Sequence, residues 1–131
     1  MRILLDTNAW LWMTVDSGRL GPVARKIVLS GENEVVLSAV SAWEISIKWA
    51  LGKLHLPVPP NEFAMASLRE AGFTRLDISF EDVVRVAVLP PIHNDPFDRL
   101  LIAQALAADM PILTGDPVLS RYGIATIDAT I

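Results

Sequence analysis

Four acidic residues in this sequence have the type and spacing of a metal site. Asp6 ends an apolar run, Glu44 lies shortly after a second one, Asp98 opens an alanine-rich segment, and Asp116 follows a further apolar run. Carboxylates gathered in one place repel each other unless a cation or a proton neutralises them. An all-oxygen ligand set suits the hard ions Mg²⁺ and Mn²⁺. The pattern therefore predicts a site for a divalent metal.

Taken singly, each of these acids has an ordinary structural explanation. Ser41 and Glu44 match a capping box, in which the serine caps a helix and the glutamate reaches back to its amide. Asp95 before proline is typical of a helix cap, and the helix dipole favours Asp98 in the first turn. Asp116 before proline repeats this helix-start pattern, and Asp6 suits an Asx turn with the residues after it. Only the shared location of all four favours a functional site.

Apolar runs and helical segments alternate along the chain, and they must position these acids. We expect strands at residues 2–5, 34–37, 73–78, 111–113 and 124–127. We expect helices at residues 9–13, 23–29, 42–51, 61–71, 83–88 and 96–108. Short, nearly continuous apolar strands are buried on both faces, which predicts a three-layer α/β/α fold with a central, mostly parallel sheet. The acids would then face one cleft beyond the carboxyl ends of the strands.

Composition limits the possible classes of protein. The 131 residues suit a single domain, residues 1–131, with one core, and the absence of cysteine excludes disulfides and thiolate chemistry. We expect a cytoplasmic protein, because no apolar run is long enough for a membrane span and the start lacks the pattern of a signal peptide. The net charge of -4 opposes nucleic-acid binding, unless bound cations offset it where a phosphate would approach.

The motifs around the four acids resemble a known family. They are Leu4-Leu5-Asp6-Thr7-Asn8, Ser41-Ala42-Trp43-Glu44-Ile45, the string from Asp95 to Ala105 that reads DPFDRLLIAQA, and Leu113-Thr114-Gly115-Asp116. In order, spacing and context they are similar to PIN domains. The eleven-residue string and the Trp-Glu-Ile segment look like VapC, the toxin of type II toxin-antitoxin systems. The likeness covers essentially the whole chain.

This resemblance implies a PIN-like fold and an Mg²⁺-dependent endoribonuclease, with Mn²⁺ as a substitute metal. The matching acids Asp6, Glu44, Asp98 and Asp116 would be both catalytic and metal-binding. A metal-bound water would cleave the RNA phosphodiester bond, so no histidine base is required. We assign Asp6 and Asp98 to direct ligation, and the other two to ligation or to orientation of the water.

Four further residues are candidates for supporting roles. Asn8 and Thr114 are expected to hydrogen-bond the ligating carboxylates and so fix their rotamers. Asp95 is interpreted as a helix cap that can also line the cleft, and Arg99 as a contact to RNA phosphates. The other basic residues near the motifs are expected to be solvated surface charges: Lys48, Lys53 and Arg121.

The resemblance also implies partners. VapC proteins dimerise and bind a VapB-type antitoxin across a hydrophobic groove near the acids, so a homodimer and a hetero-oligomer with an antitoxin are expected. Such a groove would explain the 52% hydrophobic composition. We expect most of the four tryptophans to lie in the core: Trp10, Trp12, Trp43 and Trp49.

Several alternatives stay open. The chain could be a non-toxin PIN nuclease of RNA processing, or a PIN fold that binds a partner without catalysis. Dehalogenase-like phosphatases and receiver-like signalling domains are disfavoured, because they need adjacent acids after the first strand and a lysine after a late one. A metal-free ribonuclease would need paired histidines, and nothing in the spacing of His55 and His93 shows such a pair.

Overall fold

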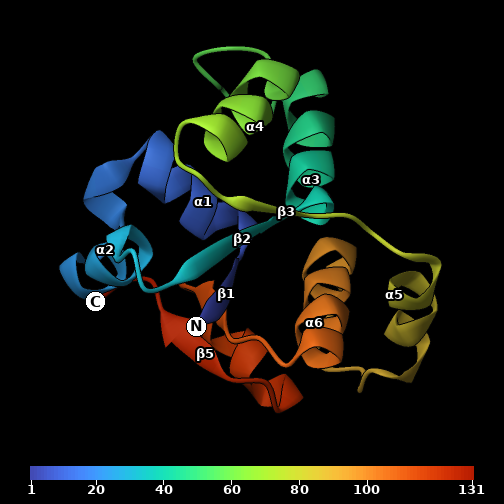
Figure 1. Cartoon of the computed structure of the whole chain (residues 1–131). Helices are drawn as coiled ribbons and strands as arrows, with labels where there is room; N and C mark the ends of the chain where they lie inside the picture. Colours follow the sequence, from blue (N-terminus) through green and yellow to red (C-terminus); the bar gives the residue numbers. More distant parts are fainter.

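The fold is built on a five-stranded sheet covered by helices on both faces (Figure 1). It is described by a computed structural model of residues 1–131. The strands are β1 (Arg2–Leu5), β2 (Glu34–Ser38), β3 (Thr74–Leu76), β4 (Ile112–Thr114) and β5 (Thr126–Asp128). The α-helices are α1 (Thr7–Thr14), α2 (Pro22–Leu29), α3 (Ala39–Ala50), α4 (Pro60–Arg69), α5 (Phe80–Arg85) and α6 (Pro96–Ala108). Short 3-10 helices are η1 (Ser17–Arg19), η2 (Val86–Val88) and η3 (Pro117–Tyr122).

The strands lie in the order β3-β2-β1-β4-β5, and every neighbouring pair is parallel. The predicted α/β/α architecture is confirmed, with a wholly parallel sheet in place of the mostly parallel one expected. Leu4 of the central strand pairs with Val36 on one side and with Ile112 on the other. The strand order reverses between β1 and β4, which is where ligands bind in open parallel sheets.

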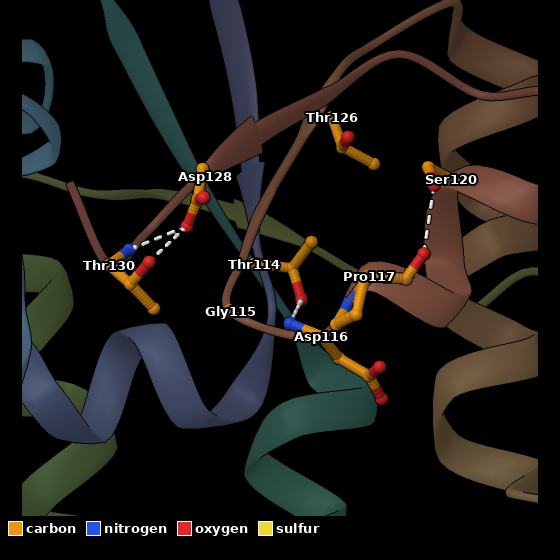
Figure 2. A pocket seen from close by; sticks show the side chains of 8 residues that line it. All are labelled: Thr114, Gly115, Asp116, Pro117, Ser120, Thr126, Asp128 and Thr130. Atoms are coloured by element: carbon orange, nitrogen blue, oxygen red, sulfur yellow. Dashed lines mark hydrogen bonds between the residues drawn. The ribbon is translucent and has the colours of Figure 1, made fainter.

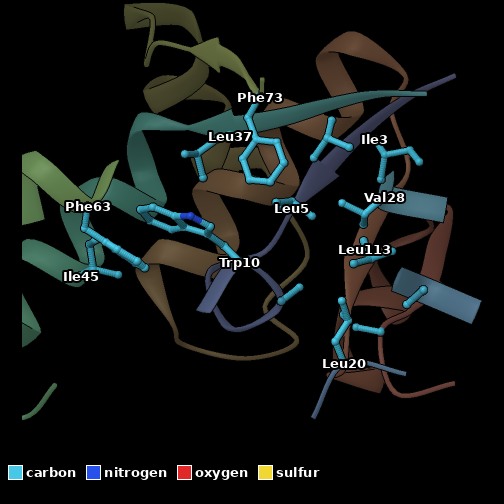
Figure 3. Close-up of a cluster of buried hydrophobic side chains, with 14 residues drawn as sticks. Ile3, Leu5, Trp10, Leu20, Val28, Leu37, Ile45, Phe63, Phe73 and Leu113 are labelled. Atoms are coloured by element: carbon cyan, nitrogen blue, oxygen red, sulfur yellow. The ribbon is translucent and has the colours of Figure 1, made fainter. Parts of the chain in front are cut away.

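Successive residues of each inner strand point to opposite faces of the sheet and build two cores. Ile3 and Leu5 of β1 join the first core, which Trp10 of α1, Phe63 of α4 and α2 complete (Figure 3). Leu4 points the other way, into a core formed with α6 and η3. Burial on both faces explains why these strands are nearly continuous apolar runs in the sequence.

Helix α3 begins earlier than the sequence suggested, and this changes the local interpretation of Glu44. Ser38, the last residue of β2, is the N-cap, and its hydroxyl accepts a hydrogen bond from the Val40 N–H at 3.0 Å. The predicted start at Ala42 and the predicted capping box of Ser41 with Glu44 are therefore wrong. Both serines can cap a helix, and Ser38 does so because β2 runs directly into α3. Glu44 is consequently free of a capping role.

Elsewhere the differences are smaller. A helix was expected at residues 83–88, but α5 runs from Phe80 to Arg85, because Ser79 and Asp82 form a capping box at its start. The 3-10 helix η2 follows it. The 3-10 helices were not predicted. Trp43 and Trp49 are 47% and 43% exposed, so the expectation that most tryptophans are core residues is wrong for these two. Trp43 still packs edge-on against Phe97 of α6, with ring centroids 4.8 Å apart.

Candidate active site

Asp6 lies at the carboxyl end of the central strand β1 and forms the N-cap of α1. Its Oδ1 accepts a hydrogen bond from the Ala9 N–H at 2.7 Å, and its Oδ2 accepts one from the Thr114 hydroxyl at 2.5 Å. Burial raises the pKa of the Asp6 carboxyl to about 6, although the two hydrogen bonds lower it. Asp98 and Glu44 raise this pKa further by charge repulsion. Asp6 is thus a buried carboxylate held by two donors.

Glu44 is buried in α3, and its two carboxylate oxygens have different surroundings. Oε2 forms an ion pair with Lys48, one helical turn further along and about half exposed. Oε1 is buried and has no hydrogen-bond partner. A buried carboxylate oxygen without a donor costs free energy, on the order of 1–3 kcal/mol or more for a charged group. Such an atom is a candidate to bind a cation.

Asp98 lies in the first turn of α6, where Asp95 caps the helix. The Asp95 Oδ1 accepts a hydrogen bond from the Asp98 N–H at 3.0 Å. The Asp98 Oδ2 lies 3.2 Å from Nε2 of His93, while its Oδ1 has no hydrogen-bond partner. Burial raises the pKa of Asp98 to about 6, with further increases from the charges of Asp95 and Glu44 and an opposing effect of His93.

The three carboxylates therefore influence one another although they come from distant parts of the chain. The charges of Glu44 and Asp98 act on Asp6, and that of Glu44 acts on Asp98. In the present side-chain positions, no three His, Asp or Glu groups are arranged closely enough to hold a metal ion. The donor set nevertheless fits a hard divalent cation, because all its ligands are oxygens and the buried Oε1 of Glu44 has no other partner.

Asp116 lies at the margin of this group. It is exposed and caps η3, with its Oδ1 accepting from the Val118 N–H at 2.9 Å. Its own N–H donates to the Thr114 hydroxyl at 3.0 Å, and that hydroxyl in turn donates to Asp6. In Figure 2 the Asp116 carboxylate extends away from Asp128. The structure thus connects Asp116 to the site through Thr114.

A polar hollow of about 280 Å³ adjoins Asp116 at the carboxyl ends of β4 and β5 (Figure 2). Hydroxyls, carboxylates, a glycine and a proline line it: Thr114, Gly115, Asp116, Pro117, Ser120, Thr126, Asp128 and Thr130. It contains no basic residue. Gly115 is required here, because a Cβ at this position would lie 2.5 Å from a ring atom of Trp12.

The supporting residues are placed unevenly. Thr114 takes the position expected of it, as a donor to Asp6, and Asp95 is a helix cap beside Asp98. Asn8 is exposed and makes no side-chain hydrogen bond, contrary to expectation. Successive helical residues are turned by about 100°, and the polar residue of α1 that is buried is Thr7. Its hydroxyl donates to Ser41 of α3 at 3.0 Å.

Arg99, for which we expect a contact to RNA phosphates, makes several hydrogen bonds within the protein. Its guanidinium donates to the carbonyl of Pro90 at 2.8 Å, to that of Val86 at 3.2 Å and to the Tyr122 hydroxyl at 3.1 Å. These contacts tie α6 to the segment that precedes it and to η3. The geometry therefore gives Arg99 a role in holding the protein together, beside the site.

Sequence reasoning missed two residues near the acids. His93 contacts Asp98, and Lys48 pairs with Glu44, where a solvated surface charge was expected. The four-residue spacing of Glu44 and Lys48 was a usable signal, since such residues are neighbours on a helix. For His93 no local pattern indicated the contact, because it depends on how the loop before α6 folds back.

None of the helices combines the length and the apolar character that a membrane span needs.

The sequence pattern of the PIN domain matches residues 3–125. The chain belongs to the PIN domain family. Within this family it is similar to Ribonuclease VapC16 of Mycobacterium tuberculosis, with 41% identity over 54 residues. That match covers 41% of this chain and 38% of the relative, so the chain is aligned to well under two thirds of the relative's length.

Solved structures of other proteins share the fold. One is VapBC2 from Rickettsia felis bound to a DNA fragment from its promoter, with a TM-score of 0.73 and 14% identity over 98% of both chains. Another is VapBC-1 from nontypeable Haemophilus influenzae, with a TM-score of 0.66 and 18% identity over 100% of both chains. At these identities the likeness concerns the architecture.

Proposed function

We propose that this PIN domain protein is a VapC-type toxin that cleaves RNA as a metal-dependent endoribonuclease. The observation that carries the proposal is the convergence of Asp6, Glu44 and Asp98 at the carboxyl ends of parallel strands. The charges of Asp98 and Glu44 raise the pKa of Asp6, the charge of Glu44 raises that of Asp98, and one buried oxygen of Glu44 has no partner. The similarity to a protein named Ribonuclease VapC16 supports the same activity.

In this proposal Asp6, Glu44 and Asp98 hold Mg²⁺, or Mn²⁺ as a substitute, with Asp116 at the margin. When bound, such a metal lowers the pKa of a coordinated water and stabilises negative charge on the phosphate. The protein's own part is to fix the carboxylates. Thr114 orients Asp6 through a 2.5 Å hydrogen bond, and Lys48 holds one oxygen of Glu44 so that the other is presented.

Burial of these carboxylates makes the site favourable for a cation. Because desolvation and mutual repulsion raise the pKa values of Asp6 and Asp98 to about 6, the ionised, metal-free site is destabilised near neutral pH. A divalent cation relieves this repulsion, and it offsets part of the net charge of -4 at the place where a phosphate would approach. The acidic composition is then compatible with an RNA substrate.

The test is cleavage of RNA by the purified chain. We expect cleavage with Mg²⁺ or Mn²⁺ and none after chelation by EDTA, with recovery when excess metal is restored. Persistence of cleavage in EDTA would overturn the metal mechanism. RNA binding without cleavage at any metal concentration would favour the alternative of a non-catalytic PIN module. Sequencing of the cut RNA ends after induced expression would identify the target.

The proposal includes protein partners, namely an antitoxin of the VapB type and a second copy of the chain. Exposed apolar side chains support it, since Phe80 is 80% and Val88 is 83% exposed. An apolar hollow of about 170 Å³ adds to them, between α3, α4 and the neighbouring strand ends. Similar solved structures carry the name VapBC.

Growth experiments separate a toxin from a nuclease of RNA processing. A toxin acting in the cytoplasm should arrest growth on induction, and co-expression of the product of a small neighbouring reading frame should relieve the arrest. Light scattering of the purified chain and of the co-expressed complex would give their stoichiometries. Absence of such a reading frame together with normal growth would favour RNA processing.

A further inference from the structure

His93 bridges the acidic site and a buried tyrosine. Its Nε2 lies 3.2 Å from Oδ2 of Asp98, and its Nδ1 lies 2.5 Å from the Tyr122 hydroxyl. Its side chain is 20% exposed, and Tyr122 is 7% exposed. With the hydrogen bond from Arg99 to the same hydroxyl, three side-chain contacts link α6, the preceding loop and η3 at one point.

The hydrogen-bonding capacity of the Tyr122 hydroxyl fixes which nitrogen of His93 carries the proton. A phenol has one proton to donate and two lone pairs that accept. The lone pairs are taken by the Arg99 Nη1–H at 3.1 Å and by the backbone N–H of His93 at 3.2 Å. The hydroxyl proton then has two acceptors within reach, Nδ1 at 2.5 Å and the His93 carbonyl at 3.5 Å. The shorter contact is preferred, so Nδ1 is the acceptor.

A neutral imidazole that accepts at Nδ1 must carry its proton at Nε2. That proton points at Oδ2 of Asp98, which accepts it. The opposite tautomer would place an Nδ1–H against an oxygen whose two lone pairs are already used, and would set a bare Nε2 against a carboxylate. The surrounding groups thus select one tautomer of His93.

We infer that His93 is a positioning residue for Asp98, with its tautomer set by Tyr122 and Arg99. The Nε2–H occupies Oδ2 and holds the carboxylate rotamer, so that Oδ1 is presented to the cation. Arg99 anchors the arrangement, because its other donors bind the carbonyls of Pro90 and Val86. This inference rests on the proposed function, in that Asp98 serves a metal.

The alternative is that His93 only fastens the loop before α6. Three substitutions distinguish the two roles. His93→Ala removes the donor, His93→Gln returns an amide N–H near the position of Nε2, and Tyr122→Phe keeps the ring but removes the group that sets the tautomer. His55→Ala is the matched control, because His55 is the other histidine of the chain and is exposed.

Two measurements test the inference. Nitrogen-15 NMR of the metal-free chain reports the histidine tautomers, and we expect the Nε2–H form for His93, with a mixture in Tyr122→Phe. Titration with Mn²⁺ followed by electron paramagnetic resonance reports affinity. We expect a loss of about 10–100-fold for His93→Ala, a recovery to within a few fold for His93→Gln, and no change for His55→Ala.

The outcomes are separable. If the metal-free chain shows the Nδ1–H tautomer at His93, or if His93→Ala folds and binds Mn²⁺ like the wild type, the inference is overturned. If His93→Ala does not fold, the Mn²⁺ affinities of Tyr122→Phe and His93→Gln, each compared with that of the wild type, test the inference instead. If the wild type binds no Mn²⁺, the proposed function is wrong. The role of His93 in positioning a metal ligand is then wrong as well, whichever tautomer the spectra show.

Discussion

Asp6 and Asp98 are the same kind of side chain in one acidic site, with pKa values raised to about 6 in both, yet different parts of the fold hold them. Asp6 is held by Thr114, its neighbour across the parallel pair β1 and β4. Asp98 is held by His93, from the loop between η2 and α6. Asp6 and Thr114, the sheet half of the site, are fixed by the core of the fold. Asp98 and His93, the loop half, are fixed by a few side-chain hydrogen bonds. Substitutions in the sheet half should therefore lower both the free energy of unfolding and RNA cleavage. Substitutions in the loop half should mainly lower the affinity for the metal.

The largest effect is expected when either carboxylate loses its charge. Asp6→Asn and Asp98→Asn should each fold and lose RNA cleavage by about a thousandfold or more, since a metal contributes several kcal/mol to the transition state. Initial rates with saturating Mg²⁺ measure this, alongside growth on induction. Asp109→Asn, an exposed carboxylate, is the control. Growth arrest by either site variant would refute its assignment.

The next effect concerns the pH dependence of stability. The pKa of Asp6 is raised in the folded chain from its usual 3.8 to about 6, so the folded state holds this proton more tightly than the unfolded state does. The stability contribution is full below about pH 4 and is lost as the pH rises through 6. Relative to the wild type, Asp6→Asn should therefore gain on the order of 2 kcal/mol at pH 7 and little at pH 4.

Urea unfolding in EDTA at pH 4, 5, 6 and 7 measures this difference. Adding Mn²⁺ at pH 7 should stabilise the wild type and leave Asp6→Asn nearly unchanged, because only the wild type keeps the full set of charges. A constant difference between the two proteins across this pH range would show that Asp6 is not strained by its burial.

An intermediate effect is expected at Thr114. Thr114→Val keeps the shape of the side chain but removes the donor to Asp6 and the acceptor for the Asp116 N–H. We expect a loss of about 1–3 kcal/mol in the free energy of unfolding and about 10–100-fold in cleavage. Tyr122→Phe, the matching change beside Asp98, should cost less stability and should lower Mn²⁺ affinity by a few fold, because part of His93 keeps the Nε2–H form. Equal stability losses in both variants would contradict the contrast between the two halves.

The smallest effect is expected at Asp116. Its carboxylate is exposed, and asparagine caps a helix about as well as aspartate does. Asp116→Asn should change stability by less than about 0.5 kcal/mol and should lower cleavage by about tenfold or less, consistent with a role at the margin. A loss as large as that of Asp6→Asn would place Asp116 among the direct ligands.

Local patterns predicted most of the fold. Apolar runs such as the one before Asp6 and caps such as Asp95 predicted which strands and helices follow one another along the chain, because each signal lies within a few residues. The start of α3 was misplaced because Ser38 and Ser41 are both able to cap a helix. The choice between them depends on where β2 ends, which pairing with β1 and β3 decides.

The candidate site was predictable only in part. Strand ends in a parallel sheet share one edge, so the meeting of Asp6 with Glu44 and Asp98 follows from the topology. The hydrogen-bond partners of these acids do not follow from the topology. The approach of His93 to Asp98 depends on the conformation of a loop, and whether Thr7 or Asn8 points inward depends on the exact rotation of α1 about its axis. Arg99 shows the same limit, since it adjoins Asp98 in sequence and its guanidinium binds elsewhere.

The pairing of β1 with β4 also constrains how the chain can be made. Thr114, which fixes Asp6, lies 108 residues further along, so the central strand lacks its β4 neighbour until that part of the chain has been synthesised. Contacts between residues so far apart in sequence form late in folding, because the entropy of loop closure is lost before the strand pairing stabilises the chain. On a ribosome, Asp6 and Glu44 emerge well before Asp98 and Thr114. The acidic site therefore cannot be assembled before Thr114 has been synthesised, 108 residues after Asp6.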